Sequence, residues 1–345
     1  IMSATVRDIA RLAGVSISTV SRVLNDMDCV DDATRERVKR VMNEQGYVRR
    51  PRVKPSDRAR RVCIVLSDDT DRSIHSHPTV YTILGGLTSR LNELNIGNSL
   101  FMLGDAERGA GALLSAKADG YIFIRTRREQ EDIVIPKLLE QRNAPVMAVN
   151  RLLDDQRVSY VNLDDYAAVC HATEHLIKLG HRRIGFVMGE ESLRNSTLRR
   201  DGYLAAMKQH GLEVDGDWVL SGAYSEDYGK RAAREVLRLE PERRPTGLLT
   251  ASDVIALGVQ KQLLKSGLRL PEDMSVVGFG DVELAAYINP PLTTVRIPAR
   301  EMGIQAANAI NYLMQSPSIM NIKILMKSEL CIRGSTMAYS PNGFE

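Results

Sequence analysis

The sequence predicts an α/β fold in two parts: a small N-terminal unit of three helices and a large core of alternating strands and helices. Two observations support this prediction. Apolar residues recur at helical spacing through residues 5–45. From residue 62 onward, apolar segments of strand length alternate with amphipathic segments of helical length, which is typical of parallel sheets covered by helices.

The first helix is predicted to begin at Thr5, whose hydroxyl can cap it, with Asp8 three residues further on. Its inward-facing residues are expected to be Ile9, Leu12 and Ala13. Gly14 can adopt a positive φ, so a tight turn is expected there. Ser16 can cap a second helix, which is expected to turn Val20, Val23 and Leu24 inward.

The start of this second helix has the features of a DNA-reading element. In a helix-turn-helix unit, the first residues of the second helix meet base edges in the major groove. We expect Arg22 to read a base edge, and Ile17 and Ser18 to set the half-site preference. Ile17 lies in line with Val20, so a place in the core is the alternative for it. The candidate DNA contacts here are Thr5, Ser16, Ile17, Ser18, Thr19, Ser21, Arg22 and Asn25.

A third helix is predicted from about Asp32 to Gln45, capped by Asp31, and it completes a DNA-binding domain over residues 1–47. The alternative for this domain is a helical subdomain without a DNA role. An exposed arginine on a capped helix favours DNA binding.

Residues 48–61 form a basic linker with six Arg, one Lys and two Pro. Such a segment is either a solvated tether or an arm that contacts phosphates and the minor groove. Its position beside a DNA-reading unit favours the arm. The candidate contacts are Arg49, Arg50, Arg52 and Val53.

Charge is distributed unevenly along the 345 residues. The net charge is +3, yet residues 1–61 hold fourteen Lys/Arg against eight Asp/Glu. This asymmetry is typical of a nucleic-acid-binding unit attached to a near-neutral body. The four cysteines are scattered without a CxxC pair, and no apolar run is long enough to cross a membrane, so we expect a cytoplasmic protein.

In the core, nearly every predicted strand ends in a polar residue. The predicted strands lie in residues 62–68, 99–105, 120–126, 145–151, 183–189, 218–224, 247–253 and 275–281. The predicted helices span residues 80–94, 166–179, 198–210, 228–237 and 254–266. Ligands of open α/β sheets bind beyond the carboxyl ends of the strands, so two facing sheets would form a cleft lined by these polar residues.

Five segments of the chain carry a family resemblance that covers about 330 residues. They read AGVSISTVSRVLN, HLIKLGHRRIGFVMG, LPEDMSVVGFGD, PPLTTVRIPAREMG and SELCIRGST. They resemble the lactose-repressor (LacI/GalR) family of transcription regulators. The resemblance implies a periplasmic-binding-protein-like core of two Rossmann-like lobes joined by three crossovers. It also implies a homodimer on a palindromic DNA operator, with a small effector between the lobes.

The lobes are expected at about residues 62–160 with 293–320, and about 161–292 with 321–337. Matching to the family places these residues in the effector cleft: Ser67, Asp68, Arg125, Asn150, Arg151, Arg199, Tyr224, Ser252, Asp253 and Asp281. The family often has Asp where this chain has Gly280, and GFGD is similar to gluconate-type members.

The arginines, and the missing Asp at Gly280, favour an anionic effector such as a sugar acid or a sugar phosphate. The alternative is that Arg125 and Arg151 pair with acidic neighbours.

The sequence favours a repressor of a carbohydrate or sugar-acid operon that needs no cofactor. A regulator of a nucleobase-like pathway is an alternative. A solute-binding protein of a transport system would need a secretion signal, and an enzyme would need a dinucleotide fingerprint or a catalytic constellation. His171 and His175 have a spacing that can bind zinc, but no third ligand is evident, so no metal site is expected.

Overall fold

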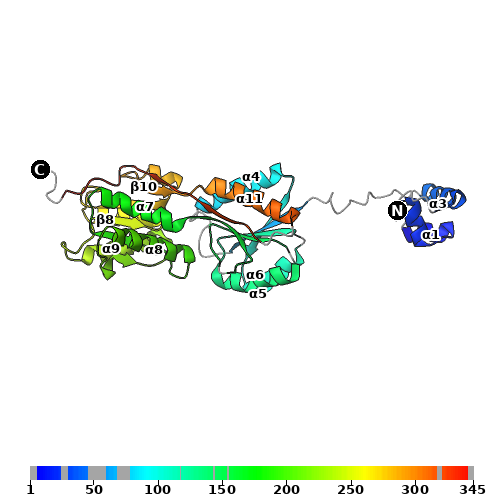
Figure 1. Cartoon of the computed structure of the whole chain (residues 1–345), viewed down its shortest axis with the longest axis horizontal. Coiled ribbons are helices and arrows are strands. Elements are labelled where there is room, and N and C mark those ends of the chain that lie inside the picture. The colour runs from blue at the N-terminus through cyan, green and yellow to red at the C-terminus, as the bar shows by residue number, and fades with distance from the viewer. Residues whose placement is uncertain are drawn as a thin grey trace. The chain divides into compact units, whose positions relative to one another are not determined.

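The computed structural model describes residues 6–24, 30–45, 60–67, 78–116, 118–142, 144–153, 155–316 and 321–340. The chain divides into two compact units, residues 1–58 and 59–345 (Figure 1). Several predicted contacts lie outside the described residues, so their predictions stay untested. They are Thr5, Asn25, Arg49, Arg50, Arg52, Val53, Asp68 and the side chain of Ser21.

The N-terminal unit contains the three expected helices, α1 (Val6–Ala13), α2 (Ile17–Leu24) and α3 (Asp32–Glu44). Gly14 has a φ of 64° between α1 and α2, and the Asp31 carboxylate caps α3 by accepting a hydrogen bond from the Thr34 amide at 2.9 Å. The small core contains Ile9, Ala10, Ala13, Val20, Val23, Val30 and Val38. The expected burial of Leu12 is wrong: its side chain is 51% exposed, because α1 turns Ala10 inward beside Ile9.

The first lobe of the core is built on a parallel sheet, ordered β11-β5-β4-β3-β1-β2 in the described chain. Its strands are β1 (Arg61–Ser67), β2 (Gly97–Leu103), β3 (Gly120–Ile124), β4 (Val146–Val149), β5 (Ser159–Leu163) and β11 (Lys323–Met326). Its helices are α4 (Pro78–Glu93), α5 (Ala106–Ser115), α6 (Arg128–Arg142) and α11 (Ala299–Gln315). Helices α4 and α11 cover one face and α5 and α6 the other (Figure 1).

Alternation along β1 shows why both faces are covered. Val62 and Ile64 pack with the α4–α11 side, whereas Cys63 and Val65 pack with the α5–α6 side. Successive side chains of a strand point to opposite faces, so a strand that is apolar throughout needs an apolar layer on each side.

The second lobe repeats this plan with the order β12-β10-β9-β8-β6-β7. Its strands are β6 (Ile184–Val187), β7 (Val219–Leu220), β8 (Gly247–Thr250), β9 (Ser275–Gly280), β10 (Thr293–Arg296) and β12 (Glu329–Cys331). The pairing of β12 with β10 is antiparallel, and the other neighbours are parallel. Its helices are α7 (Asp165–Lys178), α8 (Arg194–Gln209), α9 (Glu226–Arg238) and α10 (Asp253–Lys265), with short 3-10 helices at Gly216–Trp218 and Glu283–Ala286.

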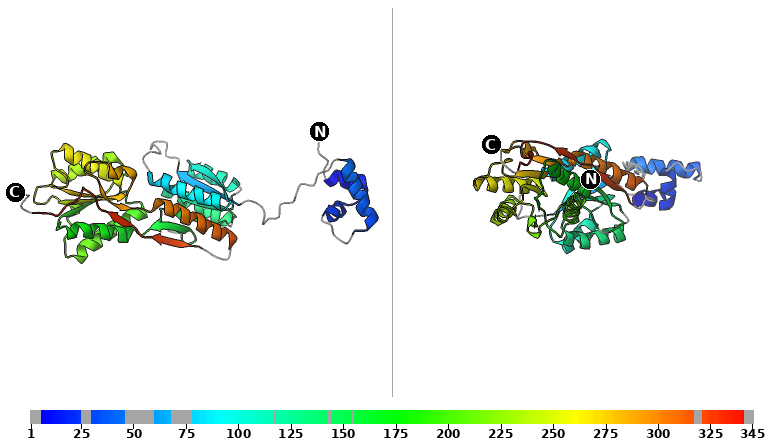
Figure 2. Two further views of the ribbon diagram at one scale, coloured as in Figure 1. Left: turned by 90° about the horizontal axis from the view of Figure 1, so that it is seen from above. Right: turned by 60° about the vertical axis from the view of Figure 1, so that its left-hand side comes forward.

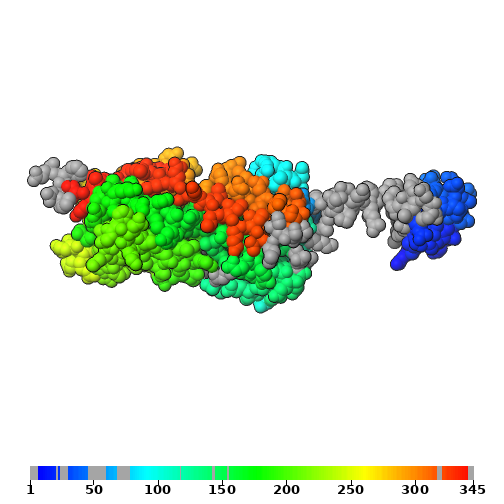
Figure 3. Space-filling model, viewed as in Figure 1, coloured from blue at the N-terminus to red at the C-terminus, as the bar shows by residue number. Residues whose placement is uncertain are grey.

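The chain passes between the two lobes after β5, after β10 and after β11 in the part that the structure describes. Figures 2 and 3 show these lobes and the red segment after α11 that runs along both. The observed lobe boundaries differ from those expected from the sequence. Residues 159–163 and 323–326 belong to the first sheet, and residues 293–296 belong to the second.

The eight predicted strands and five predicted helices of the core each overlap an observed element, although β7 is reduced to two residues. The prediction missed β5, β10, β11 and β12, and the helices α5, α6 and α11. Helix α6 contains Pro136, which ordinarily argues against a helix interior.

The C-terminal segment is held to the second lobe by buried His181, which is 2% exposed. Its Nδ1 atom lies 2.9 Å from the Thr246 hydroxyl. Its Nε2 atom lies 3.0 Å from the Ser275 hydroxyl and 3.3 Å from the Met337 carbonyl oxygen. Burial lowers the pKa of His181 from 6.5 to about 4. The folded lobe therefore holds this ring neutral at pH values where the unfolded chain protonates it.

We predict that the second lobe loses stability as the pH falls from 6.5 towards 4. The unfolded state binds the extra proton in this window, so the His181 contribution falls by up to about 3 kcal/mol. Urea unfolding followed by the fluorescence of Trp218, the only tryptophan, measures it. His181→Gln should flatten the pH dependence, and the same substitution at exposed His171 is the control. An unchanged slope in His181→Gln would contradict the prediction.

Candidate functional sites

The first candidate site is the exposed face of α2. Ser16 caps this helix by accepting a hydrogen bond from the Thr19 amide at 3.1 Å, and its hydroxyl lies 2.6 Å from that of Ser18. Ile17 is 49% exposed, which decides against the core alternative. Arg22 is exposed and Thr19 is half-buried. The helix contains no acidic residue, so its exposed face suits a polyanion.

The second candidate site is a cavity of about 670 Å³ between the two lobes of the core. The first lobe contributes the starts of α4 and α6 and the carboxyl ends of β3 and β4. The second lobe contributes the segment before α8, Tyr224, the start of α10 and the end of β9. The expectation of a cleft at the strand ends therefore matches the position of the cavity.

Two lining residues of the first lobe stand at strand ends in a left-handed backbone conformation. Arg125 follows β3 with a φ of 51°, and Asn150 follows β4 with a φ of 57°. The Oδ1 atom of Asn150 is buried and has no hydrogen-bond partner. A buried acceptor without a donor costs free energy, so this atom is suited to a ligand that donates a hydrogen bond.

In the second lobe, Arg199 is 6% exposed and is fixed on three sides. Its Nε donates to the Asp165 carboxylate and its Nη1 to the Ala251 carbonyl, each at 2.7 Å. The guanidinium carbon lies 3.8 Å from the centre of the Phe279 ring. Arg199 lines the cavity as expected, but one of its nitrogens is committed to Asp165.

Asp253 lines the same cavity at the start of α10, where Ser252 caps the helix by accepting a hydrogen bond from the Ile255 amide at 3.2 Å. The carboxylate of Asp253 is held by the Thr294 hydroxyl at 2.5 Å and the Val282 amide at 2.8 Å. Burial raises its pKa to about 6 although these hydrogen bonds oppose the shift.

Two glycines of β9 make room for this carboxylate. A Cβ atom at Gly278 would come within 2.3 Å of Asp253 Oδ1, and one at Gly280 within 3.1 Å of Oδ2. Gly280 also has a φ of 140°, which side chains rarely tolerate. Gly280 is therefore required by the backbone and by the space that Asp253 occupies.

Tyr224 lines the cavity after β7, and its hydroxyl lies 2.8 Å from that of Ser196. A Cβ atom at Gly189 would lie 2.1 Å from the Tyr224 ring. Because Gly189 has no side chain, the Tyr224 ring can lie in this position beside the cavity.

Two predicted cleft residues, Ser67 and Asp281, lie outside the described lining, and Arg151 lines the cavity with an acidic partner. Ser67 is buried and lies outside the described lining of the cavity. Arg151 lines the cavity but forms an ion pair of 2.6 Å with Glu131, so the pairing alternative holds for it. Burial raises the pKa of Glu131 although Arg151 opposes the shift.

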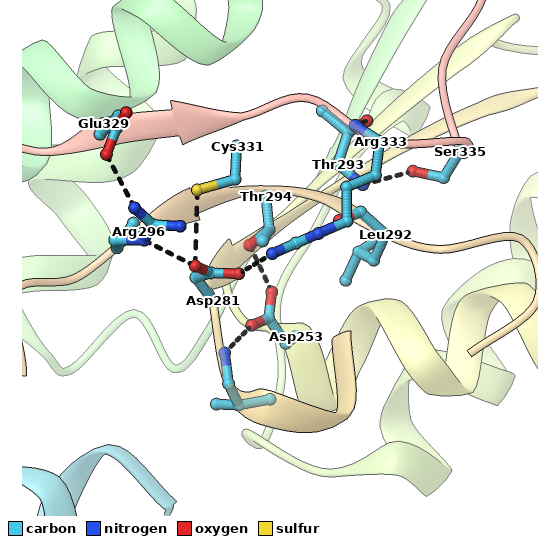
Figure 4. A network of polar contacts seen from close by, with 11 residues as sticks. Asp253, Asp281, Leu292, Thr293, Thr294, Arg296, Glu329, Cys331, Arg333 and Ser335 are labelled. Carbon is cyan, nitrogen blue, oxygen red and sulfur yellow. Dashed lines mark hydrogen bonds and ion pairs between the residues drawn. The ribbon is translucent and has the colours of Figure 1, made fainter. Parts of the chain in front are cut away.

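The second correction is Asp281, which also lies outside the described lining. Its carboxylate accepts from Arg296 at 2.7 Å and from Arg333 at 2.6 Å, and the Cys331 sulfur lies 3.4 Å away (Figure 4). Burial opposes ionisation, but the two arginines outweigh it and hold the pKa of Asp281 below its ordinary value. Because Arg296 also pairs with Glu329 at 2.9 Å, this network joins β9, β10 and β12.

The comparisons with known proteins agree with this architecture. A model described as "Bacterial regulatory proteins, lacI family" matches residues 5–50, and a "Periplasmic binding protein-like domain" matches residues 173–336. The transcriptional repressor CytR of Escherichia coli (strain K12) is 31% identical over 346 residues, which cover 97% of each chain. The chain belongs to the LacI family.

Another relative in the LacI family is the transcriptional regulator CelR of Thermobifida fusca, 32% identical over 96% of this chain and 98% of that protein. A structure of a CelR–cellobiose complex matches with a TM-score of 0.73 at 31% identity, covering 96% of this chain and all of that one. A lac repressor dimer bound to operator and the anti-inducer ONPF matches with a TM-score of 0.70 at 26% identity, covering 98% and 100%. The predicted family and fold class are confirmed.

The sequence interpretation missed several residues of the cavity. Phe279 lies inside the VVGFGD strand and was passed over for the polar residues after it. Asn195 also lines the cavity, and it donates a hydrogen bond to the carboxylate of Asp165, which pairs with Arg199 from outside the described lining. The available signal for Asp165 was the pair of acids at residues 164 and 165, directly before the predicted helix at residues 166–179.

Within the described residues, no group of three or more His, Cys, Asp or Glu could hold a metal ion. The Nε2 atom of His175 lies 3.2 Å from the Thr336 hydroxyl oxygen. No described helix has both the length and the apolar character needed to cross a bilayer.

We predict that Asp165→Ala lowers the free energy of unfolding of the core by about 3–5 kcal/mol. The change leaves the Arg199 guanidinium buried without its counter-ion, which costs far more than losing an exposed pair. Urea unfolding followed by Trp218 fluorescence measures the loss. Asp155→Ala, which breaks the more exposed pair with Arg157, is the matched control and should cost at most about 1 kcal/mol. Equal losses in the two variants would contradict the prediction.

Proposed function

We propose that this protein is a repressor that binds a palindromic operator as a homodimer and changes its operator affinity when a small effector binds in the core. The observation that carries the proposal is that one chain combines a DNA-suited α2 face with a cavity lined from two lobes. Neither a solute-binding protein nor an enzyme requires the α2 face.

A ligand between the lobes can act on the chain as a switch. It contacts strand ends of both lobes, so it binds most tightly to one relative arrangement of them. A ligand shifts an equilibrium only by its difference in affinity for the two states, and contacts from both sides supply that difference. The basic linker then connects the first lobe to the DNA-binding unit.

We propose a carbohydrate or a sugar acid as the effector. The Asn150 Oδ1 atom needs a donor, such as a hydroxyl group. Tyr224 offers an aromatic ring to the apolar side of a sugar ring. Five arginines and four acids are among the described residues that line the cavity, and three of these arginines, Arg128, Arg151 and Arg199, pair with acids. Two of the partner acids, Glu131 and Asp165, lie outside the lining, so the site has no surplus of positive charge, and an anionic group would depend on individual arginines rather than on the net charge.

For DNA binding, we predict that Arg22→Ala weakens operator binding by about 1–3 kcal/mol and relaxes the preference for one base. The reason is the loss of a bidentate contact from an exposed side chain of α2. Fluorescence anisotropy at fixed salt with operator variants measures both effects. Arg11→Ala, an exposed arginine on α1, is the control. Unchanged affinity and base preference in Arg22→Ala would contradict the assignment.

For the effector, we predict that sugars or sugar acids raise the melting temperature of the core, since a ligand at a hundred times its Kd adds about 2.7 kcal/mol. The panel contains neutral sugars, sugar acids and sugar phosphates. Asn150→Asp keeps the acceptor but adds a negative charge in the cavity. It should weaken anionic ligands at least tenfold and leave neutral ones nearly unchanged.

Asn95→Asp is the matched control for this variant, because Asn95 also has a positive φ of 55° but follows α4 away from the cavity. A panel without any stabilising member would contradict a carbohydrate effector. An anionic ligand that binds Asn150→Asp as tightly as the unaltered protein would contradict the proposed place of its charge.

A further inference from the structure

The basic linker ends at a fixed point of the first lobe. The amide of Arg61, its last residue, donates a hydrogen bond to the half-buried Asp119 carboxylate at 2.8 Å. The Asp119 amide donates in return to the Arg61 carbonyl oxygen at 2.7 Å, and the Gly97 amide donates to the Arg60 carbonyl oxygen at 2.9 Å. Asp119 therefore holds both polar groups of the Arg61 backbone where the linker passes into β1.

The last turns of α11 pack at the same point. Gly120 begins β3, and a Cβ atom there would lie 3.1 Å from Ile310 Cγ1 and 3.4 Å from Met314 Sδ. The missing side chain lets α11 pack directly on the start of this strand. In the amide orientation that satisfies both groups, the Gln315 oxygen accepts hydrogen bonds from the Arg60 guanidinium at 2.8 and 3.1 Å. The end of α11 thus contacts both the end of the linker and the strand beside it.

The other end of α11 stands at the cavity between the lobes. Ile297, two residues before the helix, lines that cavity, and so do Pro78, Thr79 and Val80 at the start of α4. The seventeen residues of α11 extend about 25 Å at 1.5 Å per residue, which is the path from the cavity to the linker.

Helices α4 and α11 lie side by side and touch backbone to backbone near the cavity (Figure 1). A Cβ atom at Gly303 would come within 2.1 Å of the Ile83 carbonyl oxygen, and one at Gly86 within 2.1 Å of the Arg300 carbonyl oxygen. Interiors packed this closely transmit a displacement rather than absorb it. We therefore expect the two helices to move together.

We propose that Asp119 is a positioning residue that couples the core to DNA binding, with α11 as the rigid element between the cavity and the linker. The inference rests on the proposed function and adds the place at which the linker receives the signal. A change in the arrangement of the lobes shifts the α4–α11 pair, and the hydrogen bonds between Asp119 and Arg61 pass that shift to the end of the linker. Packed helices and hydrogen bonds of this kind can carry coupling between distant sites.

Operator DNA can serve as the test ligand, because coupling between two sites is reciprocal. The full unaltered chain first selects a duplex from a randomised palindromic library. Hydrogen exchange, measured by mass spectrometry, is then compared with and without a saturating amount of this duplex. We expect the duplex to change the exchange rates at the starts of α4 and α11 by about fivefold or more, the low end of typical couplings.

Asp119→Ala should remove most of this change while the protein still binds the duplex. Asp119→Asn keeps an acceptor for the Arg61 amide and should retain the change. Asp105→Ala is the matched control, because Asp105 caps α5 of the same lobe by accepting a backbone hydrogen bond at 2.9 Å. It loses an equivalent bond and should respond to DNA as the unaltered protein does. Gln315→Ala should weaken the response, and it carries the test if Asp119→Ala does not fold or bind.

Three results would overturn the inference. Equal responses to DNA in Asp119→Ala and Asp105→Ala would mean that Asp119 only stabilises the strand ends. A loss in Asp119→Asn as large as that in Asp119→Ala would show that the hydrogen bond to Arg61 does not carry the coupling. A duplex that changes exchange in the DNA-binding unit but not in α4 and α11 of the unaltered protein would exclude the path along α11 and leave DNA binding intact. If the unaltered protein selects no duplex, the proposed function itself fails.

Discussion

The carboxylate of Asp165 is the contact on which the cavity depends. It stands directly after the first crossover and accepts hydrogen bonds from Asn162, Asn195 and Arg199 at 3.1, 2.6 and 2.7 Å. Asn162 belongs to the first sheet, whereas Asn195 and Arg199 belong to α8 of the second lobe. One buried charge therefore fixes the end of β5, the start of α8 and the Arg199 guanidinium that lines the cavity. A buried ion pair of this kind specifies geometry more than it stabilises the fold, because desolvation offsets much of its attraction.

Other charged side chains around the cavity are also paired with neighbours of opposite charge. Glu131 neutralises Arg151 and Asp165 neutralises Arg199, so two cations that look available in the sequence already have partners. In the described part of the chain, Asp253 accepts hydrogen bonds from the Thr294 hydroxyl and the Val282 amide and from no cation, and burial raises its pKa. The site offers a ligand directed donors and acceptors, and much of its formal charge is balanced before any ligand arrives. Specificity in such a site comes from hydrogen-bond geometry, since leaving a buried group unpaired is costly.

Much of the fold could be predicted from the sequence, because strands buried on both faces and helices with one apolar face leave strong local patterns. The turn at Gly14 and the caps at Ser16 and Asp31 could also be predicted, because each depends on residues that are close together in the sequence. The assignment of β5, β10 and β11 to lobes could not be predicted, since a strand's own pattern does not show which strand it pairs with; β5 and β11, for example, pair across more than a hundred residues. The same limit applies to the site. Strand ends predicted Arg125, Asn150 and Tyr224, and the family resemblance added Arg199, but the partners of Arg151 and Asp281 come from other elements.

Backbone strain adds a last constraint at the boundary between the lobes. Asn95, Arg125, Asn150 and Asp281 are the described non-glycine residues with positive φ, and the last three directly follow β3, β4 and β9. Such conformations cost of order 1 kcal/mol or more each and persist only where surrounding contacts fix them. Arg125 and Asn150 line the cavity, and Asp281 is held by two arginines beside the second crossover. The strain is thus concentrated where the rigid sheets end and the lobes meet. Contacts made there by a ligand act on the part of the core where the arrangement of the lobes is decided.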